Sequence, residues 1–311
     1  MESISEIFRI GTGPSSSHTM GPRKAVQQFI AEYPSAVNFE VYLYGSLAAT
    51  GKGHLTDKAI EDVLSPVGEL VINWCPDFVP QYHTNGMRIV GRDVCGIVLG
   101  DRTVYSVGGG KIVWDTEVSG ESDSKKSVYP MRRISDILEW CERTGKSYWE
   151  YVDECEGEYI WDYLHEVWEV MKASVKRGLE GEGVLPGGLG VRRKAVSYYM
   201  KASGYSSSLK SRGLVYSYAL AVSEENASGG MIVTAPTCGS CGVLPAVLYH
   251  LYLSREFSEK RILRALATAG IFGNVVKTNA SISGAEVGCQ GEVGVACAMA
   301  AAAASQLFGG S

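Results

Sequence analysis

Two short segments near the N-terminus combine histidine with glycine and hydroxyl residues. The first reads GTGPSSSHT at residues 11–19 and lies just ahead of a predicted helix. Hydroxyl groups and free backbone N–H groups at a helix start favour binding of a carboxylate or phosphate. A capped, solvent-facing loop fits the composition equally well. The segment therefore indicates either an anion site or a structural turn.

The second segment reads GKGHLTD at residues 51–57. His54 stands between a glycine turn and a predicted helix N-terminus. The positive end of a helix favours neutral imidazole, which can act as a base. A loop histidine is more often simply solvated, so the segment alone leaves both interpretations open.

Cys238 and Cys241 form a CxxC pair, CGSC. Such a pair can be half of a zinc site or a redox-active dithiol. A zinc site needs two more ligands, and the nearest histidine, His250, stands alone. A redox pair needs a longer preceding strand than Met231–Thr234 provides. We favour structural thiols at a tight turn over these two alternatives.

Cys289 lies in a glycine-rich segment, KTNASISGAEVGCQGEVG, at residues 277–294. A cysteine among glycines, with bare backbone N–H groups nearby, suits a thiolate that binds an iron–sulfur cluster. One cysteine cannot hold a cluster, so the spacing by itself leaves this chemistry open.

The elements that must position these residues divide the chain into two predicted domains. In the first, residues 1–150, a helix opens at Gly21-Pro22 and a half-buried strand follows at 37–44. A second helix, which Thr56 can cap, runs through Leu64. Further strand-like runs are predicted at Glu69–Trp74, Met87–Val90, Cys95–Leu99 and Thr103–Val107. This mixture predicts an α+β domain with a mixed sheet, not a succession of βαβ units.

The second domain, residues 151–311, is predicted to be mostly α-helical. Apolar stripes predict helices at 159–179, 193–202, 214–225, 243–253 and 259–269. Two more helices are predicted between the linker and this domain, at 134–143 and, across the boundary, at 148–154. The polar segment Gly120–Ser127 is predicted to be an exposed loop or linker. The acidic runs Asp153–Glu158 and Glu224-Glu225 are interpreted as solvated helix termini.

Composition excludes several function classes. The 311 residues carry a net charge of −5 without a basic block, so nucleic acid and anionic membranes are poor partners. The longest apolar run, Val295–Ala304, falls short of the ~20 residues of a bilayer span, so we expect a packed helix and no membrane. The acidic start Met1–Glu6 lacks a signal-peptide pattern. We expect a cytoplasmic protein whose eight cysteines are thiols or metal ligands.

Five segments together carry a specific resemblance. They are residues 9–25 (RIGTGPSSSHTMGPRKA), 44–57 (YGSLAATGKGHLTD), 223–229 (SEENASG), 235–245 (APTCGSCGVLP) and 277–294. With these segments in this order, the chain closely resembles the bacterial iron–sulfur-dependent L-serine dehydratases (L-serine ammonia-lyases) of the single-chain type. The resemblance covers essentially the whole chain. It implies a small α+β domain followed by a largely helical catalytic domain.

The resemblance implies conversion of L-serine to pyruvate and ammonia, in amino-acid catabolism and gluconeogenesis. It implies a 4Fe-4S cluster, no pyridoxal phosphate, and a homodimer. Substrate carboxylate recognition is expected from Ser15, Ser16, Ser17, His18 and Thr19. The other implied roles are a general base (His54, with His18 as the alternative), a cluster ligand (Cys289), pocket-lining residues (Thr237 and Asn279) and loop-shaping thiols (Cys238 and Cys241).

The chain departs from the resembled family at its C-terminal end. There the remaining cluster cysteines, and in some members an active-site tail, follow the glycine-rich helix that here ends at 305–311. We therefore expect a C-terminally truncated chain, and the activity of this polypeptide is then in doubt. The alternative is that Cys238, Cys241 or Cys297 supply cluster ligands.

Two other function classes stay open. One is a cluster-free amino-acid-binding protein that keeps the serine-rich loop, which anaerobic iron–sulfide reconstitution would separate from the lyase. The other is a thiol oxidoreductase, whose thiol–disulfide exchange would disappear in Cys238→Ser. Threonine also stays open as a minor substrate, because one methyl group is discriminated by only ~1–3 kcal/mol.

Overall fold

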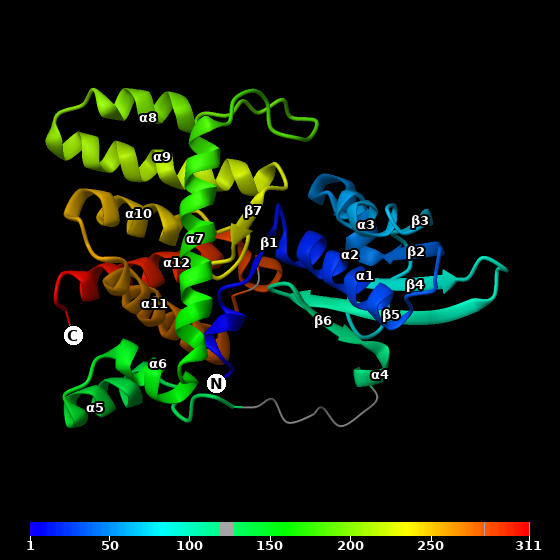
Figure 1. The fold of residues 1–311 in the computed structure, drawn as a ribbon, viewed down its shortest axis with the longest axis horizontal. Helices are drawn as coiled ribbons and strands as arrows, with labels where there is room; N and C mark the ends of the chain where they lie inside the picture. Colours follow the sequence, from blue (N-terminus) through cyan, green and yellow to red (C-terminus); the bar gives the residue numbers. More distant parts are fainter. Residues whose placement is uncertain (119–126, 283, 311) are drawn as a thin grey trace. The chain divides into compact units, whose positions relative to one another are not determined.

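The computed structural model describes residues 1–118, 127–282 and 284–310. Contacts divide the chain into two compact units (Figure 1): unit 1 comprises Met1–Gly11 and Lys125–Ser311, and unit 2 comprises Thr12–Ser124. The first residues thus belong with the C-terminal part of the chain. The expected domain boundary at residue 150 stays a prediction, and the predicted loop at 120–127 lies outside the described residues except for Ser127.

Unit 2 contains a five-stranded mixed sheet with helices. The strands lie in the order β3-β2-β4-β5-β6, where only β2 and β3 are parallel. Their bounds are Asn38–Tyr44 (β2), Glu69–Cys75 (β3), Gly86–Arg92 (β4), Val98–Gly108 (β5) and Lys111–Trp114 (β6). The helices are α1 (Gly21–Glu32), α2 (Gly45–Thr50), α3 (Thr56–Leu64) and α4 (Asp115–Val118). The predicted α+β class is confirmed.

Alternation along β2 builds the core of unit 2. Every second residue of β2 is buried, so that Phe39, Val41 and Leu43 point to one face of the sheet. Phe29 of α1 and Leu64 of α3 belong to the same apolar cluster. α1 and α3 therefore cover the apolar face of the sheet, the face to which every second residue of β2 points.

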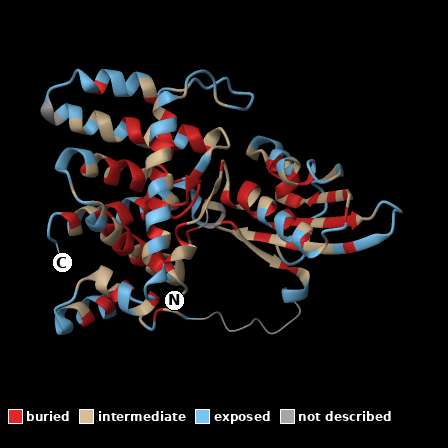
Figure 2. Cartoon of the chain, viewed as in Figure 1, coloured by how far each residue is buried: buried red, intermediate tan, exposed pale blue. Residues whose placement is uncertain are grey.

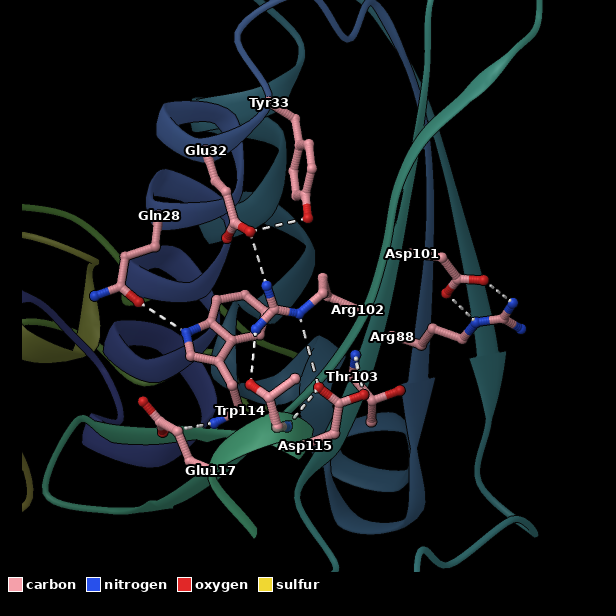
Figure 3. Close-up of polar contacts among 11 residues, drawn as sticks. Gln28, Glu32, Tyr33, Arg88, Asp101, Arg102, Thr103, Trp114, Asp115 and Glu117 are labelled. Atoms are coloured by element: carbon pink, nitrogen blue, oxygen red, sulfur yellow. Dashed lines mark hydrogen bonds and ion pairs between the residues drawn. The ribbon is translucent and has the colours of Figure 1, made fainter. Parts of the chain in front are cut away.

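Polar side chains fasten α1 to the edge of this sheet (Figure 3). The Trp114 indole donates to Gln28 at 3.0 Å, and Arg102 pairs with Glu32 at 2.8 Å. The Arg102 guanidinium also lies over the Trp114 ring, 4.9 Å from its centroid. This network fastens the C-terminal half of α1 to β5 and β6.

Two local expectations for unit 2 were wrong. The runs at 95–99 and 103–107 are not separate strands, because β5 is continuous and Cys95 lies in a turn that Asp93 caps through backbone N–H groups. Thr56 does not cap α3. Leu55 occupies the N-cap position, and the Thr56 hydroxyl donates instead to the His18 carbonyl at 2.6 Å.

Unit 1 is mostly helical among the described residues, as expected. It contains the helices α5 (Ile134–Thr144), α6 (Tyr148–Glu156), α7 (Tyr159–Glu180), α8 (Ala195–Ser203), α9 (Ser207–Ala227), α10 (Val243–Arg255), α11 (Glu259–Asn279) and α12 (Gly284–Leu307). The short strands β1 (Ile10–Thr12) and β7 (Met231–Val233) pair with each other. α11 runs well past its predicted end at 269, because its later turns contain small residues that weaken the apolar period.

The long helix α7 lies at the centre of unit 1 (Figures 1 and 2). It packs against α8, α9, α10 and α11. Its predicted stripe is confirmed, since Leu164, Val167, Met171 and Val175 are fully buried. Trp168, on the same helix, is the largest fully buried side chain described.

Glu224 and Glu225 are buried, so their interpretation as solvated termini was wrong. The Glu225 carboxylate pairs with Arg177 at 3.0 Å and with Arg193 at 3.2 Å. Glu224 accepts a bond from the Lys194 backbone N–H at 2.6 Å. These partners lie 30 or more residues away along the chain, so only the fold brings them together.

Glu156, in the other acidic run, is also buried. Its Oε1 accepts hydrogen bonds from the Ile4 backbone at 2.7 Å and from the Tyr129 hydroxyl at 2.6 Å. Paired in this way, a carboxylate can be buried without the cost of an unpartnered polar group. The carboxylate thereby fastens the N-terminal segment to unit 1.

The described chain contains one helical stretch long and apolar enough to cross a membrane. It is Val287–Leu307 in α12, with 21 residues and a mean hydropathy of 1.3. The expectation that no apolar stretch approaches a bilayer span was therefore wrong by length and composition. One face of this stretch packs against α10 and α11 and buries Ala296, Met299 and Ala303. A core helix accounts for the same composition.

Candidate functional site

The serine-rich loop and the His54 segment lie side by side in unit 2. Ser15 caps the short π-helix Ser16–Met20, and its hydroxyl accepts a bond from the His18 backbone at 3.1 Å. The Thr19 hydroxyl donates to the His54 carbonyl at 2.7 Å. With the reciprocal bond from Thr56 to His18, two hydroxyl groups join the segments. The two imidazole rings lie with their centroids 4.6 Å apart.

His18 is held as a neutral imidazole. Its Nε2 lies 3.1 Å from the Ser46 hydroxyl and 3.3 Å from the Ser46 carbonyl, and its Nδ1 lies 3.1 Å from the Ser17 hydroxyl. Because a carbonyl only accepts, we assign the proton to Nε2 and a donated bond from Ser17 to Nδ1. Burial and the nearby His54 lower the pKa of His18 to about 4.

His54 has the complementary hydrogen-bond pattern. Its Nδ1 lies 3.0 Å from the Thr50 carbonyl, which places the ring proton on Nδ1 in the neutral form. No group in the described ranges bonds its Nε2, so this nitrogen keeps an available lone pair. The next residue, Leu55, has φ 55°, a left-handed conformation that is costly for a non-glycine residue. The backbone thus holds His54 at a constrained turn.

The low pKa of His18 makes the stability of unit 2 depend on pH. Between pH 6.5 and about 4 the unfolded chain binds a proton that folded His18 does not, so the free energy of unfolding should fall as pH falls through this window. Urea denaturation of the native chain and of His18→Gln across this range checks the result. The difference between them should shrink towards low pH, and parallel curves would contradict the assignment.

The other predicted site residues lie in unit 1. Thr237 is buried, and its hydroxyl lies 3.1 Å from that of Ser240. Asn279 ends α11 and is exposed, and its amide donates to the carbonyls of Arg132 at 2.7 Å and Val275 at 2.8 Å. Cys289 is exposed and follows Gly288, where α12 is interrupted.

Cys238 and Cys241 form no disulfide and have about 1% exposure each. Burial raises the pKa of Cys241 well above its usual value, so this thiol is protonated and unreactive. Both the zinc and the redox interpretations need an accessible thiolate. The geometry favours the structural interpretation of this pair.

The donor set of unit 1 fits one ligand of an iron–sulfur cluster. Cys289 is accessible, and in the described residues no other cysteine accompanies it in the glycine-rich turn. Cys297, also exposed, follows eight positions later, about 12 Å along a helix. Cys238 and Cys241 would have to leave their buried loop. Among the described residues Cys289 is therefore the candidate ligand, and a complete set would also need Cys297 or a rearranged Cys238 and Cys241.

One other group of metal-ligand side chains occurs in the described ranges. His165 lies 2.9 Å from Glu259 and 4.0 Å from Glu169, all at partly exposed positions. Lys172 already neutralises Glu169 at 2.6 Å. An ion-pair cluster explains these contacts without a metal.

Sequence reasoning did not identify Ser46, Thr50 or Glu292. Ser46 and Thr50 orient the two histidines, and both stand in the segment 44–57 that carries the family resemblance. Glu292 stands three residues after Cys289, in the segment 277–294. Their presence in those segments was the available signal, but single hydroxyl or carboxylate side chains show no partner in a sequence.

Family models define the class of the chain. A model described as serine dehydratase alpha chain matches residues 95–311, and one described as serine dehydratase beta chain matches residues 3–66. One polypeptide thus carries the two parts of a dehydratase, an enzyme of the lyase class. The chain belongs to the serine dehydratase family.

Curated relatives agree with this assignment over the whole chain. The L-serine dehydratase of Haemophilus influenzae is 39% identical, with 100% of this chain and 80% of the relative covered. L-serine dehydratase 2 of Escherichia coli is 39% identical, with 100% and 79% covered. The L-serine dehydratase of Streptomyces coelicolor is 39% identical, with 99% and 79% covered.

Proposed function

We propose that this chain is an L-serine ammonia-lyase that converts L-serine to pyruvate and ammonia. The observation that carries the proposal is the histidine pair of unit 2, in which His18 is held neutral and His54 keeps an available Nε2 lone pair. Serine loses its α-proton and its β-hydroxyl to form aminoacrylate and water. Aminoacrylate then tautomerises to an imine, which water hydrolyses to pyruvate and ammonia.

His54 is the proposed general base. A base must have an unprotonated nitrogen within reach of the proton it accepts, and Nε2 of His54 satisfies the first condition in the neutral ring. His18 is the weaker candidate, because the hydrogen bonds of Ser46 and Ser17 engage both of its nitrogens. We propose that His18, because it stays neutral, places no positive charge beside the ring of His54.

The hydroxyls of Ser15 and Ser16 are the proposed recognition groups for the substrate carboxylate. Ser17, predicted from the sequence to belong to the same group, donates its one hydroxyl proton to His18 Nδ1, so we assign it to orienting that ring. Thr19 holds the serine-rich loop in place. Its hydroxyl accepts a hydrogen bond from the Ser15 backbone N–H at 3.2 Å and donates one to the His54 carbonyl. We assign Thr19 to positioning this loop rather than to substrate contact. Thr237 and Asn279 stay proposed pocket residues.

Cys289 is the proposed protein ligand of a 4Fe-4S cluster. When bound, such a cluster supplies a Lewis acid that assists departure of the serine hydroxyl. The family resemblance supports four further parts of the proposal. The chain uses no pyridoxal phosphate, forms a homodimer, is cytoplasmic, and has no nucleic-acid or membrane partner.

Anaerobic reconstitution with iron and sulfide tests the proposal. We expect bound iron, thiolate-to-iron absorption and pyruvate from L-serine, and we expect Cys289→Ser to lose iron and activity together because a serine hydroxyl is a poor iron ligand. Cys95→Ser, at an exposed position in unit 2, is the matched control. Colourless protein that still binds serine would support a binding protein instead, and normal iron in Cys289→Ser would remove that residue as ligand.

A further inference from the structure

Glu292 lies where the Thr237–Cys241 loop meets the start of α12. Its Oε1 accepts a hydrogen bond from the Gly284 backbone N–H at 3.0 Å. Its carboxylate accepts a second bond from the Thr237 side chain, and partial burial raises the pKa of Glu292. No step of the proposed reaction uses this carboxylate, so it needs another explanation.

Two glycines around Glu292 are explained by the space that its carboxylate fills. A Cβ added to Gly239 would lie 2.6 Å from Oε2, and one added to Gly284 would lie 2.7 Å from Oε1. Neither glycine has a left-handed φ, so the backbone at both positions would accept an L-residue. A side chain at either position would therefore displace the carboxylate from its place.

The same carboxylate spans the interruption of α12. Gly288 has φ 72° and ψ 169°, and helical geometry resumes at Cys289. Gly284 precedes the interruption and Glu292 follows it by about one turn. The bond between them therefore holds the chain on both sides of Cys289.

We propose that Glu292 is a positioning residue that fixes Cys289 and the Thr237–Cys241 loop in one arrangement. The inference rests on the proposed role of Cys289 as a cluster ligand, whereas the contacts it uses can be tested without a cluster. Apart from Glu292, Thr237 bonds to Ser240 of its own loop, and Ser240 donates to the Ala235 carbonyl at 3.1 Å. Loss of the carboxylate thus removes a polar contact that joins this loop to α12.

Alkylation of individual cysteines in the iron-free chain tests this arrangement. Iodoacetamide labelling followed by peptide mass spectrometry reports each thiol separately. In Glu292→Ala we expect Cys238 and Cys241 to react about tenfold faster, the factor that corresponds to losing one hydrogen bond to a charged group. Exposed Cys95 in unit 2 is the internal reference, with an unchanged rate.

Two further variants separate positioning from general loss of structure. Glu292→Gln should keep native rates, because its amide oxygen accepts from Gly284 and its amide N–H group donates to the Thr237 hydroxyl. Gly239→Ala should reproduce the effect of Glu292→Ala, because its Cβ displaces the carboxylate. The double variant should be no faster than either single one, since both remove the same contact. Gly188→Ala, whose Cβ meets nothing within 4 Å, is the matched control.

Iron binding gives an independent readout. We expect Glu292→Ala to bind less iron than the native chain and to show altered thiolate-to-iron absorption, with Glu292→Gln restoring both. A native chain that binds no iron would overturn the proposed role of Cys289, while the alkylation rates would still decide the role of Glu292. Native alkylation rates in both Glu292→Ala and Gly239→Ala would overturn the inference, whatever the iron content.

Discussion

Replacement of His54 by alanine should lower kcat for L-serine dehydration by about 10²–10⁴-fold, the usual contribution of a general base. The expected loss follows from the hydrogen bond to Thr50, which leaves Nε2 as the available proton acceptor of the pair. The KM for serine should change little, because the carboxylate-recognition loop keeps its own supports. Steady-state pyruvate formation by the reconstituted enzyme measures both constants.

Controls distinguish a lost base from a disturbed fold. His54→Gln can still donate to the Thr50 carbonyl but cannot accept the α-proton, so it should be as inactive as His54→Ala. Added imidazole should restore part of the alanine variant's activity and none of the glutamine variant's. His165→Ala, at an exposed position in unit 1, should keep native activity. A kcat within twofold of native in His54→Ala would remove His54 as the base.

Replacement of Trp168 by alanine should destabilise unit 1 by about 3–5 kcal/mol. Trp168 is fully buried in α7 and contacts Tyr252 edge-on, with ring centroids 5.7 Å apart. The loss is a large part of the ~5–15 kcal/mol that holds a typical domain folded. Calorimetry or urea denaturation should show the change, with Met200→Ala, 70% exposed, as a near-neutral control.

Trp168→Phe should cost much less than Trp168→Ala. The indole Nε1 is buried and has no hydrogen-bond partner among the described residues. Phenylalanine removes this unpartnered N–H, which offsets part of the lost packing. Equal losses in the two variants would show that the indole N–H has a partner, such as an ordered water.

Local patterns in the sequence were sufficient for most elements. The stripe of α7 and the alternation of β2 depend on neighbours two to four residues apart, which the sequence contains in full. The boundaries failed where small residues weaken the period, as in the second half of α11. The prediction divided β5 in two because Gly100, Asp101 and Arg102 interrupt its apolar residues, whereas in the structure these three residues pair with β4.

The candidate site was predictable as segments but not as an arrangement. The motifs containing His18, His54 and Cys289 stood out by residue type. The tautomers of the two histidines could not be predicted in this way. They depend on the carbonyl and hydroxyl groups of Ser46 and Thr50, which the fold places beside the rings. The same holds for Glu225, because its two partners, Arg177 and Arg193, are more than 30 residues away along the chain.

The family, the order of the elements and the residue types at the candidate site were all readable from the amino-acid sequence. Each of these depends only on the order of the residues and on neighbours along the chain. Three properties became visible in the folded chain: which thiols are buried, which histidine nitrogen keeps a lone pair, and why glycine stands at 239 and 284 beside Glu292. Those properties depend on hydrogen bonds and close contacts between residues far apart in sequence, which form only when the chain has folded.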